Sequence, residues 1–281
     1  MFLKGIALNY VLNVTDNLGR KVTGSFWYTF HVLAMTYLSF RAVLFDQAQG
    51  FRAIISVVSA QIYFTGWQAL PLIGGLALST GGVVIMQSTL QLSKLGGAGM
   101  MGELLVAVIV RELGPLITAL IVIARSGTAI ASDLGNMKVN RETEALEAMG
   151  INPLSYIIFP RIVGGIVSVV CLSFYFVLIA LMGGYIVGYL FLDLSFVFYT
   201  DTLAQAVKFS DVWFFLLKNI FGGTIIFVVC SYQGLLVKES PSEVPQVTTK
   251  AVVNSIVYVV GFNLFVTLLS YLEQLTRYGI I

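Results

Sequence analysis

Charged residues are scarce in this sequence. Only 11% of the 281 residues are Asp, Glu, Lys or Arg, and 58% are apolar. Soluble proteins carry about 25% charged residues, which they need to cover a water-exposed surface. We therefore exclude a soluble fold and expect an all-α polytopic membrane protein.

Cysteine and histidine are scarcer still. The two cysteines, Cys171 and Cys230, are too few and too far apart for a disulfide scaffold or a metal cluster, and we interpret both as small buried residues. The single histidine, His31, has no nucleophile or metal ligand near it in the sequence. We expect no catalytic residues, no metal site and no cleaved signal peptide in this chain.

Nucleotide and nucleic-acid sites are also missing from the pattern. No G-x-x-x-x-G-K-[ST] loop is present, and a net charge of +2 is too small to indicate a nucleic-acid partner. An activity driven by ATP would therefore depend on another protein.

Long apolar runs are what the sequence does have. A helix needs about 20 apolar residues to cross a bilayer, and five segments meet this requirement. They are residues 56–86, 104–126, 156–190, 212–237 and 251–272. We divide the chain into an N-terminal segment, residues 1–50, and a transmembrane domain, residues 51–281.

The segment at residues 25–45 is ambiguous. It is apolar enough for a sixth span, but it contains His31, Arg41 and aromatic residues crowded at one end. Aromatic residues flanked by basic ones are typical of a helix that lies in the membrane interface. We favour the interfacial helix and keep a sixth span as the alternative.

The distribution of Lys and Arg predicts the orientation. With five spans and a cytoplasmic N-terminus, the inner segments contain eleven of these residues and the outer ones four. Because positive residues favour the cytoplasmic side, we expect the N-terminus inside and the C-terminus outside.

A short charged helix lies between the second and third spans, in KVNRETEALEAMGINPLSYIIFPR, residues 138–161. Asn140 is predicted to be its N-cap, Gly150 its C-terminal cap, and Asn152 the N-cap of the next helix. The spacing clusters Val139, Ala145, Leu146 and Met149 on one arc, with Arg141, Glu144 and Glu147 opposite and Glu142 within the apolar arc. So short a helix is marginal in water, so we expect it to dock on a cytoplasmic partner, although a solvated connector is the alternative.

The second predicted span carries two adjacent charges, Arg111 and Glu112. Ionisable residues at this depth need a protein partner or a water-filled cavity. Lys218, early in the fourth span, is the expected partner of Glu112, and Pro115 is expected to kink the helix because it cannot donate to the Arg111 carbonyl. These charges are interpreted either as a structural ion pair or as a polar hinge.

Three stretches together resemble a known family. They are RELGPLITALIVIARSGTAIASDLG from residue 111, NRETEALEAMGINPLSYIIFPR from residue 140, and TTKAVVNSIVYVVGFNLFVTLLS, residues 248–270. This series is similar to that of the MlaE-type permeases, membrane subunits of ABC transporters that move lipids between bacterial membranes. The resemblance covers roughly residues 50–272.

The resemblance implies a homodimer in the bacterial inner membrane. Each copy would dock a coupling helix on a cytoplasmic ABC ATPase, which would bind the ATP and Mg²⁺, and this chain would itself bind no cofactor. A periplasmic MCE-domain protein would exchange phospholipid with it and so contribute to outer-membrane lipid asymmetry. The resemblance also implies an N-terminal helix in the membrane plane.

The resemblance assigns two sets of site residues by position. The coupling helix, residues 141–149, would contact the ATPase through Glu142, Glu144, Leu146, Glu147 and Met149. An outward-open lipid cavity would be lined by Val84, Gln91, Leu92 and Leu95.

One departure from the family concerns Asn263, which stands where some relatives have an acidic residue. Any charge network joining the second, fourth and fifth spans is therefore expected to be reduced here. Two other functions remain open from the residues alone. One is an ion-coupled transporter that uses Arg111, Glu112 and Lys218 as a relay, and the other is a structural anchor for an MCE complex.

Overall fold

The computed structural model describes residues 27–43, 51–95, 100–238 and 240–277, and every regular element in these ranges is helical. Five stretches are long and apolar enough to cross a membrane, which confirms the predicted all-α polytopic fold. They are Ile54–Leu92, Met101–Val139, Leu154–Phe191, Phe209–Leu235 and Pro241–Leu272. Each is longer than its predicted span, because the polar ends of the helices continue beyond the apolar windows.

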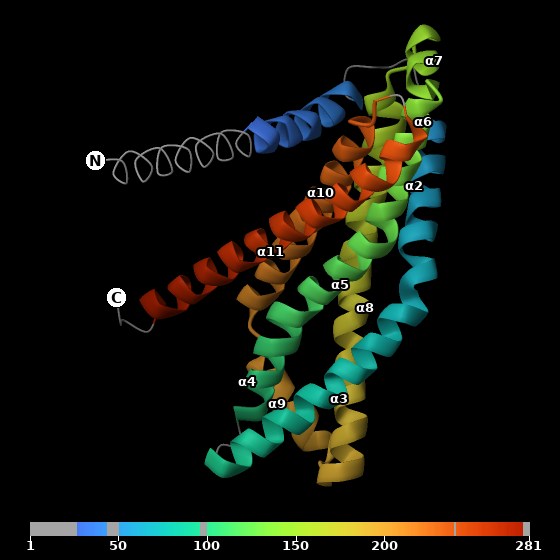
Figure 1. Cartoon of the computed structure of the whole chain (residues 1–281). Coiled ribbons are helices and arrows are strands. Elements are labelled where there is room, and N and C mark those ends of the chain that lie inside the picture. The colour runs from blue at the N-terminus through green and yellow to red at the C-terminus, as the bar shows by residue number, and fades with distance from the viewer. Residues whose placement is uncertain (1–26, 44–50, 96–99, 239, 278–281) are drawn as a thin grey trace, which may run out of the picture.

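The first two spans are not continuous α-helices. The first consists of α2 (Phe51–Thr65), a 3-10 turn (Trp67–Ala69) and α3 (Leu70–Leu95), and it bends between α2 and α3 (Figure 1). The second consists of α4 (Met101–Leu105), a π-helix (Val106–Leu113), α5 (Gly114–Val122), a π-helix (Ile123–Gly127) and α6 (Thr128–Val139). Such π-helical turns often occur at functional positions in helices.

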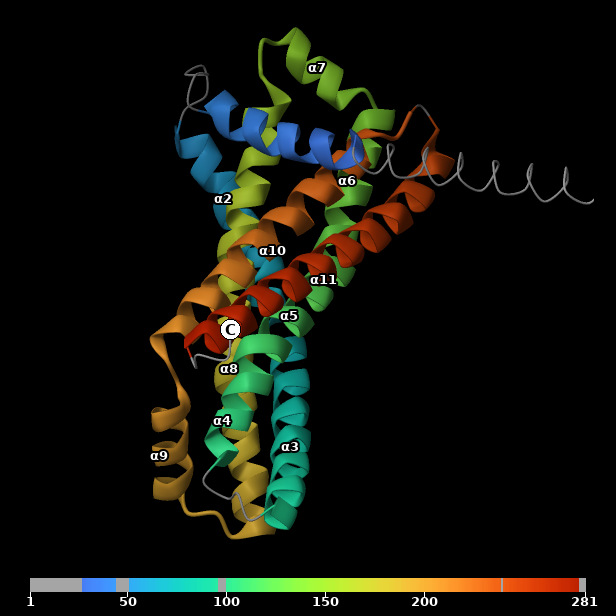
Figure 2. The same cartoon turned by 90° about the vertical axis from the view of Figure 1, so that its left-hand side faces the viewer.

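The second half of the chain contains the short helices at the two ends of the bundle. In order, the elements are α7 (Glu142–Ala148), a π-helix (Leu154–Ile158), α8 (Phe159–Leu192), α9 (Phe196–Ala206), α10 (Phe209–Leu235), a 3-10 turn (Pro241–Glu243) and α11 (Val244–Arg277). Helix α7 lies beyond the bundle at one end, and α9 lies against α4 at the other (Figures 1 and 2).

Small residues bring the spans together. A Cβ atom on Gly81 of α3 would lie 1.8 Å from the Ala180 carbonyl oxygen of α8, and one on Gly102 would lie 2.1 Å from the Thr202 carbonyl oxygen of α9. Only glycine allows backbones to approach this closely. Between α8 and α10, a glycine makes room for a side chain instead. Gly165 of α8 lies against the ring of the fully buried Phe227 of α10.

The helix at residues 27–43 lies across the bundle near α7 in both views (Figures 1 and 2). Its Tyr28 ring stacks on Tyr258 of α11 at 5.8 Å, and the Tyr28 hydroxyl accepts a hydrogen bond from Gln233 Nε2 at 3.0 Å. Burial raises the pKa of the Tyr28 phenol, so it stays neutral. A helix anchored on one side by aromatic contacts has the geometry expected of an interfacial helix, but its place in a membrane stays a prediction.

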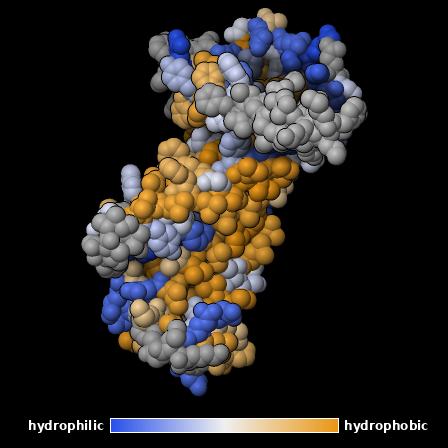
Figure 3. All heavy atoms as spheres, turned by 60° about the vertical axis from the view of Figure 1, so that its left-hand side comes forward, coloured by the Kyte–Doolittle hydropathy of each residue, from blue (hydrophilic) through white to orange (hydrophobic). Residues whose placement is uncertain are grey.

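Apolar side chains cover the middle of the face drawn in Figure 3, and polar ones gather toward the two ends. Cys230 is buried, as predicted, but Cys171 is exposed, so the expectation that both are buried is wrong for Cys171. Cys171 lies on an outward face of α8. Such a face of a membrane helix is apolar without protein contacts, because lipid contacts it instead.

Candidate functional site

Arg111, in the π-helix of the second span, forms an ion pair with Asp211 of α10. Arg111 Nε lies 2.8 Å from Asp211 Oδ1, and the side chains are 21% and 4% exposed. The other carboxylate oxygen of Asp211 accepts the Lys208 backbone N–H at 3.0 Å, which caps the start of α10. One carboxylate therefore both begins α10 and fixes it to the second span.

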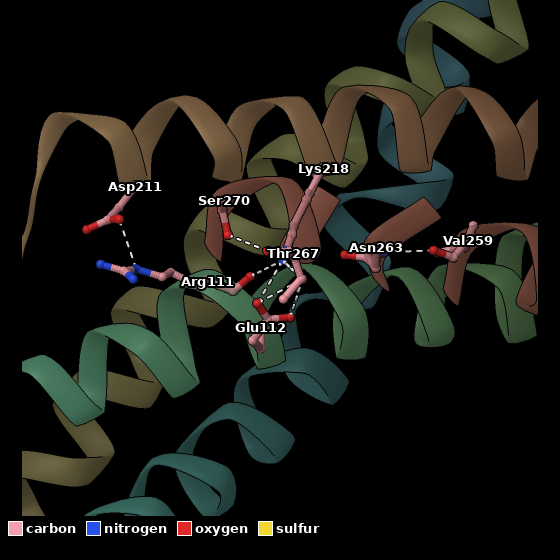
Figure 4. Close-up of polar contacts among 8 residues, drawn as sticks. All are labelled: Arg111, Glu112, Asp211, Lys218, Val259, Asn263, Thr267 and Ser270. Atoms are coloured by element: carbon pink, nitrogen blue, oxygen red, sulfur yellow. Dashed lines mark hydrogen bonds and ion pairs between the residues drawn. The ribbon is translucent and has the colours of Figure 1, made fainter. Parts of the chain in front are cut away.

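The neighbouring Glu112 contacts Lys218, further along α10, and Thr267 of α11, as Figure 4 shows. Lys218 Nζ of α10 donates to Glu112 Oε1 at 3.0 Å and to the Thr267 hydroxyl of α11 at 2.9 Å. Thr267 Oγ1 also lies 3.0 Å from both carboxylate oxygens of Glu112. The predicted pairing of Glu112 with Lys218 is thus confirmed, and it joins the second, fourth and fifth spans.

The third proton of Lys218 satisfies the backbone group that Pro115 leaves unpaired. Lys218 Nζ lies 2.7 Å from the Arg111 carbonyl oxygen, the acceptor to which residue 115 would donate in a regular α-helix. The irregularity expected at Pro115 takes the form of the π-helix that ends at Leu113, one residue before α5. A buried ammonium ion with three acceptors is well satisfied, and the Glu112 side chain that pairs with it is 41% exposed.

The charged junction consists of Arg111, Glu112, Asp211, Lys218 and Thr267. Two of them, Asp211 and Thr267, were not identified from the sequence. Asp211 follows a loop and reads as an ordinary first-turn residue of α10, and Thr267 reads as one of several small polar residues in an apolar helix. Asn263, one turn before Thr267, is buried and donates to the Val259 carbonyl oxygen at 3.0 Å. Asn263 thus takes no part in the contact with Glu112 and Lys218. The neutral Thr267 hydroxyl, one turn further along α11, provides the link to the fifth span instead.

Helix α7 is bounded as firmly as its sequence predicts at its C-terminal end. Gly150 has a φ of +76°, which favours glycine, and its N–H bonds to the Glu147 carbonyl while the Ile151 N–H bonds to that of Leu146. Asn152 Oδ1 then accepts the Leu154 N–H at 3.0 Å and starts the next helix. Both caps expected here are confirmed.

The predicted N-cap, Asn140, is wrong. Helix α6 continues to Val139, the Asn140 N–H still bonds to Asn136, and the break is made by Arg141 in a left-handed conformation, φ 57°. Because the hydrogen-bond ladder of α6 uses Asn140, only one residue is left to turn the chain. A left-handed non-glycine residue costs about 1 kcal/mol, so the junction between α6 and α7 is both short and strained.

The two faces of α7 border different cavities. Ala145, Leu146 and Met149, together with Glu142, line a mostly apolar cavity of about 430 Å³ against α2, α6 and α8. Val139 belongs instead to a second cavity of about 460 Å³, which it lines with Lys138, Arg141, Glu144 and Val237–Lys238. Its assignment to the apolar arc is wrong, since it precedes the turn at Arg141.

The residues assigned to partner contact are distributed over these faces. Glu144 accepts a hydrogen bond from Lys138 at 3.2 Å, Leu146 is partly buried against the core, and Met149 is 66% exposed. Glu147 is exposed to solvent. The acidic edge and Met149 are therefore open to a partner, while Leu146 holds the helix to the transmembrane domain.

The residues assigned to the lipid cavity lie along the last turns of α3. Gln91 is exposed, Val84 is partly buried against the core, and Leu92 is 6% exposed within the described chain. Leu95 ends α3, and its side chain lies outside the described side chains. Their role as a lipid-binding set stays a prediction.

Comparison with known proteins matches this architecture to one family. Residues 58–269 match the family model described as Permease MlaE. A probable ABC transporter permease protein of Rickettsia typhi is 30% identical over 213 residues, which are 76% of this chain and 82% of that protein. The MlaE permease protein of the intermembrane phospholipid transport system of Haemophilus influenzae is 27% identical over 75% of this chain and 81% of that protein.

A further relative, matched over less of its length, is the chloroplastic protein TRIGALACTOSYLDIACYLGLYCEROL 1 of Arabidopsis thaliana, 29% identical over 65% of this chain and 53% of that protein. The matched region begins within α2 and ends within α11, so it contains all five spans, the charged junction and α7. The chain belongs to the MlaE family of ABC transporter permeases.

Proposed function

We propose that this chain is the membrane subunit of an ABC transporter that moves phospholipid, or a similar lipid, between the inner membrane and a periplasmic MCE-type carrier. The phospholipid is suggested by the name of the Haemophilus influenzae relative. ATP and Mg²⁺ bind to a separate cytoplasmic ATPase, and the chain acts as a homodimer that contributes to outer-membrane lipid asymmetry.

The observation that carries this proposal is the position of α7. It is a seven-residue helix with two glutamates in its first turn, and it lies beyond the spans at the end of the bundle where α6 stops. The family match includes it. A helix so short is marginal on its own, and here it is held by Leu146, two caps and the tight turn at Arg141.

Movement of α7 would reach the spans by two routes. On one side, only Asn140 and Arg141 separate it from α6, which packs against α10 and α11. On the other, the capped turn at Gly150 and Asn152 leads directly into the third span. An ATPase that displaces α7 would therefore move the second and third spans together, and the Glu112–Lys218–Thr267 contact would carry that movement to the fourth and fifth.

The test is co-purification of the ATPase with the tagged chain from mild detergent, with mass spectrometry of bound proteins and extracted lipids. In the Glu144→Lys/Glu147→Lys variant the acidic edge of α7 is reversed. We expect the variant to insert and fold but to lose the ATPase, because its partner surface must be complementary to the acidic one. Phospholipid should be extracted with the wild-type protein.

The matched control is Glu103→Lys/Asp201→Lys, which changes the net charge equally at the opposite end of the bundle, where both side chains are exposed. This variant should keep the ATPase. Equal loss of the ATPase in both variants would mean that the change in net charge, and not the position of the glutamates on α7, causes the loss. Retention in the α7 variant would contradict the proposed coupling role, and the charged junction would then have to be reconsidered as an ion relay.

A further inference from the structure

Arg125, in the second π-helix of the second span, contacts neutral groups among the described residues. Its Nη2 donates to the neutral Gln68 Oε1 at 2.8 Å, and its Cζ lies 5.2 Å from the centre of the Phe64 ring. Its buried Nη1 has no hydrogen-bond partner among the described residues. An amide oxygen and a ring face orient a guanidinium ion, but they leave its charge uncompensated.

Three other basic residues of the spans pair with carboxylates. Arg111 pairs with Asp211 at 2.8 Å, Lys218 with Glu112 at 3.0 Å and Arg161 with Asp133 at 2.6 Å. In the described parts of the chain, Arg125 forms no such pair. Leaving a charge unpaired at membrane depth is unfavourable, so an anion from outside the described chain would stabilise Arg125.

The surroundings of Arg125 indicate where that anion is found. Arg125 contacts the bend between α2 and α3, and the exposed rings on this bend are Tyr63, Phe64 and Trp67, with Trp67 66% exposed. Exposed Tyr and Trp residues collect at the level of lipid headgroups. Arg125 itself is partly exposed and Gln68 is exposed, so a ligand from the bilayer reaches the guanidinium beside them.

Arg125 also lies well inside the helix rather than at its end. Helix α6 ends at Val139, fourteen positions after Arg125, and this distance is about 20 Å at 1.5 Å per residue. A basic residue in solvent would need no partner, but one at this depth beside exposed aromatic rings faces the headgroup region of the leaflet nearer α7.

From this charge balance we infer that the bend between α2 and α3 forms, with Arg125, a binding site for the phosphate of an anionic phospholipid. The guanidinium group donates charge-assisted hydrogen bonds to phosphate oxygens, while Gln68 orients Nη2. The site does not depend on the proposed transport function, because a lipid bound only for structural reasons would satisfy the same charge.

The test is native mass spectrometry of the purified full-length chain, titrated separately with phosphatidylglycerol, phosphatidylcholine and inorganic phosphate. Wild-type protein should prefer phosphatidylglycerol, and Arg125→Met should weaken its binding about tenfold, as expected for losing charge-assisted hydrogen bonds. The control Lys250→Met removes one exposed positive charge from the same end of the bundle. It should bind like the wild type.

A second variant keeps the proposal testable if Arg125→Met does not fold. Gln68→Glu places a carboxylate next to Arg125, where it should replace the lipid phosphate. We expect it to lose the preference for phosphatidylglycerol and to unfold at a higher temperature than the wild type in phosphatidylcholine.

Three results would overturn the proposal. Equal weakening in Arg125→Met and Lys250→Met would mean general attraction to a basic surface. An unchanged preference in Gln68→Glu would show that Arg125 is not the binding group. Binding of inorganic phosphate that displaces phosphatidylglycerol completely would assign the site to a free anion instead of a lipid headgroup. None of these results bears on the ATPase or on transport.

Discussion

At the scale of single residues, the enclosed Asp211 carboxylate makes Arg111 important for stability. Arg111→Met removes the cation and leaves a carboxylate that is only 4% exposed without its ion pair. We expect a loss of about 3 kcal/mol in the free energy of unfolding, as found when one partner of a buried pair is removed. Reversible unfolding in detergent measures this loss.

The double variant Arg111→Met/Asp211→Asn should recover much of that loss, because an amide can still cap α10 without a buried negative charge. The comparison variant is Lys138→Met. It breaks an ion pair whose partners are 33% and 55% exposed, and such pairs contribute about 0–1 kcal/mol. A double variant as unstable as the single one would mean that packing of the Arg111 side chain, and not the stranded charge, sets the cost.

At the scale of helices, Gly81 is one of the glycines that allow α3 and α8 to cross closely. A Cβ on Gly81 would lie 1.8 Å from the Ala180 carbonyl oxygen, a backbone atom that cannot rotate away. Gly81→Ala must therefore separate the two helices, and we expect it to destabilise the protein by about 1–3 kcal/mol, as overpacking does. The thermal unfolding midpoint in a fixed detergent measures the effect.

Gly75 provides a matched control in the same helix. A Cβ at Gly75 meets nothing within 4 Å, so Gly75→Ala should be neutral or slightly stabilising, because alanine favours helix more than glycine does. If both substitutions had the same effect, helix propensity would explain them and the close crossing would not.

At the scale of the whole molecule, the two short helices at opposite ends of the bundle report its orientation. After Cys171 and Cys230 are replaced by Ala, Glu147→Cys marks α7 and Asp201→Cys marks α9. With the N-terminus inside, a membrane-impermeant maleimide should label the α9 cysteine in intact spheroplasts, and the α7 cysteine only after lysis. The reverse pattern would contradict the orientation inferred from Lys and Arg.

Features that depend on adjacent residues could be predicted from the sequence, and most contacts between residues far apart in the chain could not. Apolar length predicts the five spans, and the caps at Gly150 and Asn152 are properties of adjacent residues, so each was correct. Asp211 and Thr267 could not be found in this way, because only the packing of α10 and α11 brings Asp211 to Arg111 and Thr267 to Glu112. The end of α6 was missed because hydrogen bonding to Asn136 overrode the capping preference of Asn140.

The π-helix at Val106–Leu113 determines how the second span responds to the deletion of a residue. A π-helical turn holds one residue more than an α-helical turn, so the segment behaves as a built-in insertion. Deleting a single residue there would restore an ordinary α-helix without rotating one half of the span relative to the other, whereas the same deletion in a regular α-helical stretch such as α6 would rotate the two halves by about 100°. The side chains of the flanking turns would keep their phase toward α10 and α11, which makes this short segment more tolerant of a one-residue deletion among its apolar residues than the regular α-helical parts of the same span.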